Sequence, residues 1–139
     1  MEILNKKLNY NYDALADVLY IYVVNFSEGE EAIELNPNMY LTIDEEAIEL
    51  NFNMYLTIDE EDIPSAIEIL DASKILETTK FSLKRIQEIH LKISINKNEI
   101  SVNCSLKIPV HNNELLKSTN DTIINDLNLP ELEAKLVMT

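Results

Sequence analysis

Glycine, cysteine and long apolar runs are scarce in this 139-residue chain, and each scarcity excludes a class of function. Phosphate-binding loops and dinucleotide fingerprints need several glycines at fixed offsets. Gly29 is the only glycine, so P-loop and Rossmann chemistry are excluded. The single cysteine, Cys104, cannot form an intramolecular disulfide, which favours a reducing, cytoplasmic location. No apolar run approaches the roughly 18 residues of a membrane span and the first residues lack a signal-peptide pattern, so we expect no membrane contact.

Basic residues are also few, and they are unevenly placed. The chain has 25 acidic and 11 basic residues, a net charge of −14. Residues 1–79 hold 18 acids and 3 bases, whereas residues 80–139 hold 7 acids and 8 bases. The acidic half should repel nucleic acid, whose phosphates require basic partners. It forms either a solubilising surface or an acidic face for a basic protein partner.

A 15-residue block occurs twice in direct succession. Residues 30–44 read EEAIELNPNMYLTID and residues 45–59 read EEAIELNFNMYLTID, so the copies differ only at Pro37 and Phe52. Two short copies are too few for a solenoid. In each copy AIEL and MYLTI predict strands, and Asn36-Pro37-Asn38 suits a tight turn. The second copy alternates apolar and polar residues throughout, so it forms either a hairpin or one long strand.

Strand patterns dominate the rest of the chain. Asp17–Val24 and Ala66–Leu70 are rich in β-branched and aromatic residues and predict strands. Residues 89–95 and 100–110 alternate around a turn at residues 96–99, which is typical of a hairpin. The sequence therefore predicts a mainly β (α+β) fold. We expect an acidic antiparallel β-meander domain with a short helix in residues 1–79, and a C-terminal β-hairpin extension in residues 80–139.

The short helices and loops are placed by local signals. Asp71 is expected to be the N-cap of a helix within residues 71–79. Residues 81–88 form either a second helical turn or an extended link. The polar residues 111–121 predict a loop, residues 122–129 a last strand, and residues 130–135 a helical turn opened by Pro130.

Two separated blocks resemble a known family. The first is YDALADVLYIYV and the second is PSAIEILDASKIL; together they carry Tyr12, Asp13, Asp17, Leu19, Tyr20 and Ile21, then Glu68, Ile69, Leu70, Asp71, Ala72 and Ser73. The segment from about residue 10 to residue 76, with its internal duplication, resembles the small bacterial and archaeal family called domain of unknown function 2283. The family tends to have a glycine where this chain has residues 60–65, and the C-terminal 60 residues lie outside its pattern. The resemblance implies a small β-meander with a terminal helix, no established activity and no catalytic residues.

Acidic residues near strand ends are the first candidates for chemistry. Asp13, Asp17, Glu68 and Asp71 could converge as a carboxylate cluster for a metal or for acid–base catalysis. Turn, strand-entry and capping roles explain the three aspartates better. The runs at residues 44–46 and 59–62 lack the spacing and central glycine of a calcium loop and are expected to be solvated turns.

Histidine, cysteine and tyrosine residues give no stronger candidates for a catalytic or metal-binding site. His90, His111 and Cys104 lack the close pairs of a zinc site. Cys104 lies in the apolar register of its strand, which favours burial over a cysteine–histidine nucleophile. The six tyrosines are assigned to packing: Tyr10, Tyr12, Tyr20, Tyr22, Tyr40 and Tyr55. We therefore assign no catalytic, cofactor-binding or metal-binding residue and expect no cofactor.

These observations favour a non-enzymatic cytosolic protein that acts through protein–protein contacts. Nearly identical strands compete for the same neighbours, so an unpaired apolar edge is expected to join a second copy into a homodimer. One alternative is an antitoxin-like acidic protein that neutralises a basic toxin. The other is a minor metal-dependent hydrolase that uses the acidic cluster.

Overall fold

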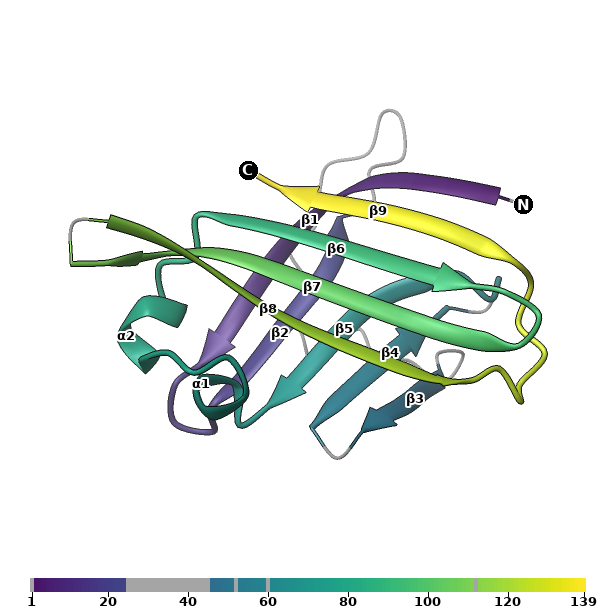
Figure 1. The fold of residues 1–139 in the computed structure, drawn as a ribbon, viewed down its shortest axis with the longest axis horizontal. Coiled ribbons are helices and arrows are strands. Elements are labelled where there is room, and N and C mark those ends of the chain that lie inside the picture. The colour runs from purple at the N-terminus through teal and green to yellow at the C-terminus, as the bar shows by residue number, and fades with distance from the viewer. Residues whose placement is uncertain (1, 25–45, 52, 60, 112) are drawn as a thin grey trace.

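The computed structural model describes residues 2–24, 46–51, 53–59, 61–111 and 113–139. Within these residues one sheet of nine strands curls into a nearly closed barrel (Figure 1). The mainly β fold class is confirmed. The elements, in chain order, are β1 (Glu2–Asp13), β2 (Val18–Val24), β3 (Glu46–Asn51), β4 (Met54–Ile58), β5 (Pro64–Leu70), α1 (Ala72–Ile75), α2 (Lys80–Leu83), β6 (Glu88–Ile95), β7 (Glu99–Val110), β8 (Asn113–Ile124) and β9 (Leu132–Met138).

The strand order is β3-β4-β5-β2-β1-β9-β6-β7-β8. Neighbouring strands are antiparallel except β1 and β9, which are parallel. The last strand of the chain thus lies between the first strand and β6, so the acidic and the C-terminal halves share a single sheet. The two ends of the sheet, β3 and β8, approach each other and nearly close the barrel.

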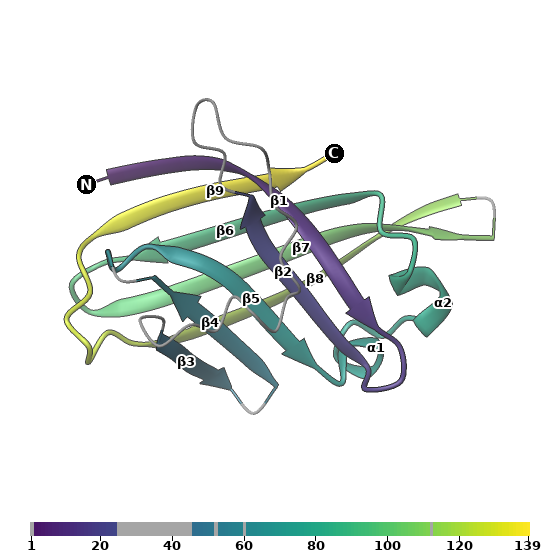
Figure 2. The same ribbon diagram turned by 180° about the vertical axis from the view of Figure 1, so that it is seen from behind.

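The barrel interior is one apolar core. Inward side chains alternate along the strands, as in β7, where every second residue from Ile100 to Ile108 is buried. Leu76, Leu83 and Ile86 belong to the same core. The segment that contains α1 and α2 therefore covers one end of the barrel (Figures 1 and 2).

The second repeat copy is a β-hairpin, not one long strand. β3 and β4 pair antiparallel, and their buried side chains follow the alternation that the sequence shows. The first copy, with its turn at Asn36-Pro37-Asn38, lies outside the described residues, as do Gly29 and Phe52. For residues 46–58 the prediction that the duplication adds sheet is confirmed: Ile48, Leu50, Met54, Leu56 and Ile58 are all buried.

Two predicted elements near the C-terminus are wrong. Residues 113–121, predicted as loop, belong to strand β8, which ends at Ile124. β8 is the last strand of the sheet and is partly or fully exposed along its length, so no buried face imposed an apolar alternation. The helical turn predicted for residues 130–135 is instead strand β9, because Leu132, Ala134 and Leu136 point into the barrel between β1 and β6.

Both short helices lie where the sequence allowed a helical turn. α1 lies within the predicted residues 71–79, and α2 at Lys80–Leu83 resolves the choice for residues 81–88 in favour of a helical turn at their start. Thr79 is the N-cap of α2, since its hydroxyl accepts a hydrogen bond from the Ser82 amide at 3.1 Å. No helix in the described ranges has the length and apolar character needed to cross a membrane.

Candidate binding groove

The carboxylate of Asp17, not that of Asp71, holds the start of α1. Asp71 occupies the predicted N-cap position of α1, but it has left-handed backbone angles and its side chain makes no capping bond. The Asp17 carboxylate instead accepts hydrogen bonds from the Ser73 amide at 3.0 Å and the Ser73 hydroxyl at 2.6 Å. Its main-chain oxygen accepts from the Ala72 amide at 3.0 Å. A residue 56 positions earlier in the chain therefore caps the helix.

Asp17 is a buried carboxylate that remains ionised. Burial opposes ionisation, but hydrogen bonds from Ser73 and Tyr12, with the nearby Lys80 charge, outweigh it and keep the pKa of Asp17 below its ordinary value. The Tyr12 hydroxyl donates to Asp17 at 2.6 Å. Burial, this bond and the Asp17 charge raise the pKa of Tyr12. The two sequence blocks that carry the family resemblance thus meet at Tyr12, Asp17 and Ser73, in a contact that is structural.

The other candidate carboxylates do not gather around Asp17. Asp13 closes the β1–β2 turn, where its Oδ1 accepts from the Leu15 and Ala16 amides at 3.0 and 3.1 Å. Glu68 lies on β5 opposite Tyr20 of β2. In the ranges that the structure describes, no three histidine, cysteine or acidic side chains are placed to hold a metal ion.

The acidic turn after β4 is organised by its first residue. Asp59 Oδ1 accepts hydrogen bonds from the Glu61 amide at 2.8 Å and the Ile63 amide at 3.0 Å. Glu61 and Asp62 are exposed, as expected for a solvated turn. The run at residues 44–46 lies almost wholly outside the described residues.

Cys104 is fully buried within β7, as predicted. Burial raises the pKa of its thiol to about 12. A thiol of this kind holds almost no thiolate at neutral pH, so it is a poor nucleophile.

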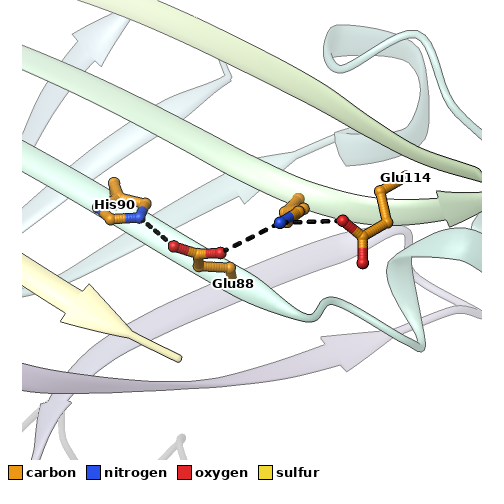
Figure 3. A network of polar contacts seen from close by, with 4 residues as sticks. Glu88, His90 and Glu114 are labelled. Carbon is orange, nitrogen blue, oxygen red and sulfur yellow. Dashed lines mark hydrogen bonds and ion pairs between the residues drawn. The ribbon is translucent and has the colours of Figure 1, made fainter.

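His90 belongs to a chain of polar and charged side chains on the outer face of the sheet. Its Nε2 lies 2.6 Å from Glu88 Oε1, and Lys107 Nζ lies 3.7 Å from Glu88 Oε2 and 2.9 Å from Glu114 Oε2 (Figure 3). The hydrogen bond to His90 is the main cause that lowers the pKa of Glu88, and the bond to Glu114 likewise raises that of Lys107. These contacts cross β6, β7 and β8 and join neighbouring strands.

Tyrosine contacts are those of packing, where the structure describes them. The Tyr10 hydroxyl accepts from the Ile86 amide at 3.1 Å and donates to the Lys84 carbonyl at 3.3 Å, which joins β1 to the segment after α2. The rings of Tyr20 and Tyr22 lie 5.7 Å apart, centroid to centroid. Tyr40 lies outside the described residues.

A groove lies between α2 and the turn end of the β7–β8 hairpin. Its volume is about 690 Å³, within the range of ligand sites. Ser82 fixes one wall against the other, because its hydroxyl donates to the Pro109 carbonyl at 3.1 Å. The groove is lined by the apolar side chains of Phe81 and Leu115, by the basic side chains of Arg85 and Lys117, and also by His111 and the acidic Glu77.

The groove combines exposed apolar surface with a small excess of basic over acidic side chains. Phe81 is 62% exposed and Leu115 is 42% exposed. The Arg85 guanidinium lies 4.5 Å from the centroid of the Phe81 ring, a cation–π contact. Among the described residues, neither Arg85 nor Lys117 forms an ion pair. The groove thus has two basic residues and one acidic residue in its lining, an excess of positive charge that is unusual in a chain with a charge of −14.

Sequence reasoning missed this groove because its walls come from segments assigned to other roles. Leu115 and Lys117 fell within the predicted loop, and Phe81 and Arg85 within an uncertain helical turn. The one available signal was the reversal of charge after residue 79.

Comparisons of the chain with family models, with curated proteins and with solved structures gave no match. The resemblance to the domain of unknown function 2283 family stays a prediction that rests on the two sequence blocks.

Proposed function

We propose that this protein is a non-enzymatic cytoplasmic protein that acts through protein–protein contact and that its partner is a second copy of itself. The observation that carries the proposal is the groove beside α2, with Phe81 and Leu115 exposed next to Arg85 and Lys117. Exposed apolar side chains beside charges are typical of protein contact surfaces. A second copy brings the charge of opposite sign, since residues 1–79 hold 18 acids and 3 bases.

The groove is a better contact surface than the sheet edge on which the sequence argument relied. β3, from the second repeat copy, ends the described sheet and lies close to β8. A neighbouring strand on that side leaves less room for another chain to add to β3. The groove instead faces outward at the end of the barrel.

The test is the mass in solution, measured by light scattering and sedimentation over a wide range of protein concentration. We expect twice the 16.0 kDa protomer mass at high concentration and dissociation on dilution. Phe81→Ser should shift the transition to higher concentration, because a side chain that is 62% exposed contributes little to the fold. Leu127→Ser is the matched control, since Leu127 is 44% exposed in the turn between β8 and β9. A protomer mass at every concentration, or an equal effect of both variants, would refute the proposal.

A further inference from the structure

The exposed tip of the β1–β2 hairpin is complementary to the groove in shape and in chemistry. The tip of the β1–β2 hairpin places Leu15 in solvent, with 99% of its surface exposed. Asp13 holds the tip by accepting hydrogen bonds from the Leu15 and Ala16 amides, and Asp17 anchors the other side of the turn to α1. The tip is therefore a preorganised apolar projection beside an exposed carboxylate.

We infer that Leu15 of each protomer inserts into the α2/β7–β8 groove of a second copy, so that the protein forms a symmetric end-to-end dimer. This inference rests on the proposed self-association and names its contacts. The apolar side chain of Leu15 meets Phe81 and Leu115 of the other copy, and Asp13 meets Arg85 and Lys117. Each feature thus contacts one of complementary chemistry.

The position of the two features explains why such a dimer closes. The β1–β2 tip and α2 lie at the same end of the barrel (Figures 1 and 2). The bonds of Tyr10 to the segment after α2, and of Asp17 to α1, hold both features on one rigid framework. Two copies that meet at this end can exchange both contacts around one twofold axis. Such an interface is isologous and stops at two subunits, whereas features at opposite ends would build open chains.

The tip can be altered without disturbing the fold, because Leu15 contacts so little of its own chain. Removing the buried part of a leucine weakens one contact by about tenfold or more. Two such contacts are lost per dimer, so Leu15→Ala should raise the dissociation constant about a hundredfold. Leu116→Ala is the matched control. Leu116 is 66% exposed, but it follows Leu115 on β8 and so points to the opposite face of the sheet.

A mixing experiment tests the reciprocal geometry. Leu15→Asp removes the projection and leaves the groove, whereas Lys117→Glu reverses the groove charge and leaves the projection. Neither variant alone should dimerise at concentrations where the unaltered protein does. An equimolar mixture should recover a heterodimer of intermediate affinity, because one intact contact remains. Circular dichroism and urea unfolding check that each variant is folded.

The outcomes separate this inference from the proposed function. A dimer that survives Leu15→Ala but is lost with Phe81→Ser would overturn the assignment of Leu15 while retaining the groove. A mixture that recovers no heterodimer would overturn the reciprocal geometry. Mass that continues to rise beyond two protomers would overturn the closed dimer. A strict monomer would remove the proposed function and this inference together.

Discussion

Replacing Asp17 tests whether a distant carboxylate, and not the adjacent Asp71, holds the first turn of α1. Three donors converge on the Asp17 side chain: the Tyr12 hydroxyl, the Ser73 hydroxyl and the Ser73 amide. A hydrogen bond to a charged group contributes about 1.5–3 kcal/mol. Tyr12 and Ser73 are half-buried, so their hydroxyls can partly turn to water, and the low end of that range applies. The three lost bonds then cost about 4–5 kcal/mol in Asp17→Ala.

Backbone conformation adds a second contribution that a companion variant isolates. Asp17 has φ 56°, in the left-handed region, where alanine costs about 1–2 kcal/mol more than glycine. Aspartate has a Cβ atom and already pays most of this backbone cost, so Asp17→Ala should lower the free energy of unfolding by the bond contribution of about 4–5 kcal/mol, and Asp17→Gly by about 1–2 kcal/mol less. Asp17→Asn keeps one acceptor oxygen and should cost only about 1–2 kcal/mol.

Asp71 supplies the matched control. It also has left-handed backbone angles, with φ 50°, but its side chain makes no capping bond. Asp71→Ala should cost no more than about 1 kcal/mol, because aspartate already pays most of the left-handed backbone cost, and Asp71→Gly should not destabilise the fold.

The assay is urea unfolding followed by far-ultraviolet circular dichroism. With a slope of about 2 kcal/mol per molar urea, Asp17→Ala should lower the midpoint by about 2–3 M. Acid gives an independent check of sign. A carboxyl whose pKa is depressed in the folded state contributes stability above its unfolded value, here 3.8. That contribution is lost as the pH falls through the folded pKa. The difference between the unaltered protein and Asp17→Asn should therefore shrink below about pH 4. An Asp71→Ala variant as unstable as Asp17→Ala would refute the assignment of the cap.

Two further predictions concern buried groups elsewhere in the barrel. Cys104 should react with a thiol reagent roughly three orders of magnitude more slowly in the native protein than in urea. The reason is that a thiol pKa of about 12 instead of 9.0 removes most of the reactive thiolate. Equal rates in the two conditions would contradict the burial of Cys104. The Asn125 side chain donates to the Asn96 and Leu129 carbonyls and accepts from the Leu129 amide, so Asn125→Ala should lower the free energy of unfolding by about 2–4 kcal/mol in urea. Asp126→Ala, at an exposed neighbouring position, is its control and should change stability by less than about 0.5 kcal/mol.

Sequence patterns found those strands that have one buried and one exposed face. The β6–β7 hairpin was predicted almost to its ends, because residues 89–95 and 100–110 alternate around a turn whose Asn96 side chain accepts from the Asn98 and Glu99 amides. β1 and β8 gave no such signal. β1 begins with EILNKKLN, in which lysines and asparagines interrupt the apolar residues. β8 has its apolar residues in adjacent pairs at its two ends, so they do not alternate.

The other features that the sequence did not predict depend on contacts between distant parts of the chain. Pro130 marked the start of an element correctly, but whether a helix or a strand followed was decided by the space between β1 and β6. The position of the N-cap at Asp71 was predicted correctly, but the side chain that makes the capping bond was not, because Asp17 reaches α1 from another part of the chain. The groove depends on two segments that meet only in the folded protein.

The position of β9 also has a consequence for how the chain folds as it is synthesised. β9 pairs with β1, so residues near position 135 must find residues near position 5. Contacts between residues so far apart in sequence close slowly, because the intervening chain loses entropy before the pairing compensates. Until Leu132–Met138 leave the ribosome, β1 and β6 each have an unpaired edge, and the two halves cannot join. The repeat hairpin and the β6–β7 hairpin can form early, but the sheet is completed only after translation has passed residue 138. During that interval both edges are exposed to other chains, so aggregation competes with the slow docking of the last strand.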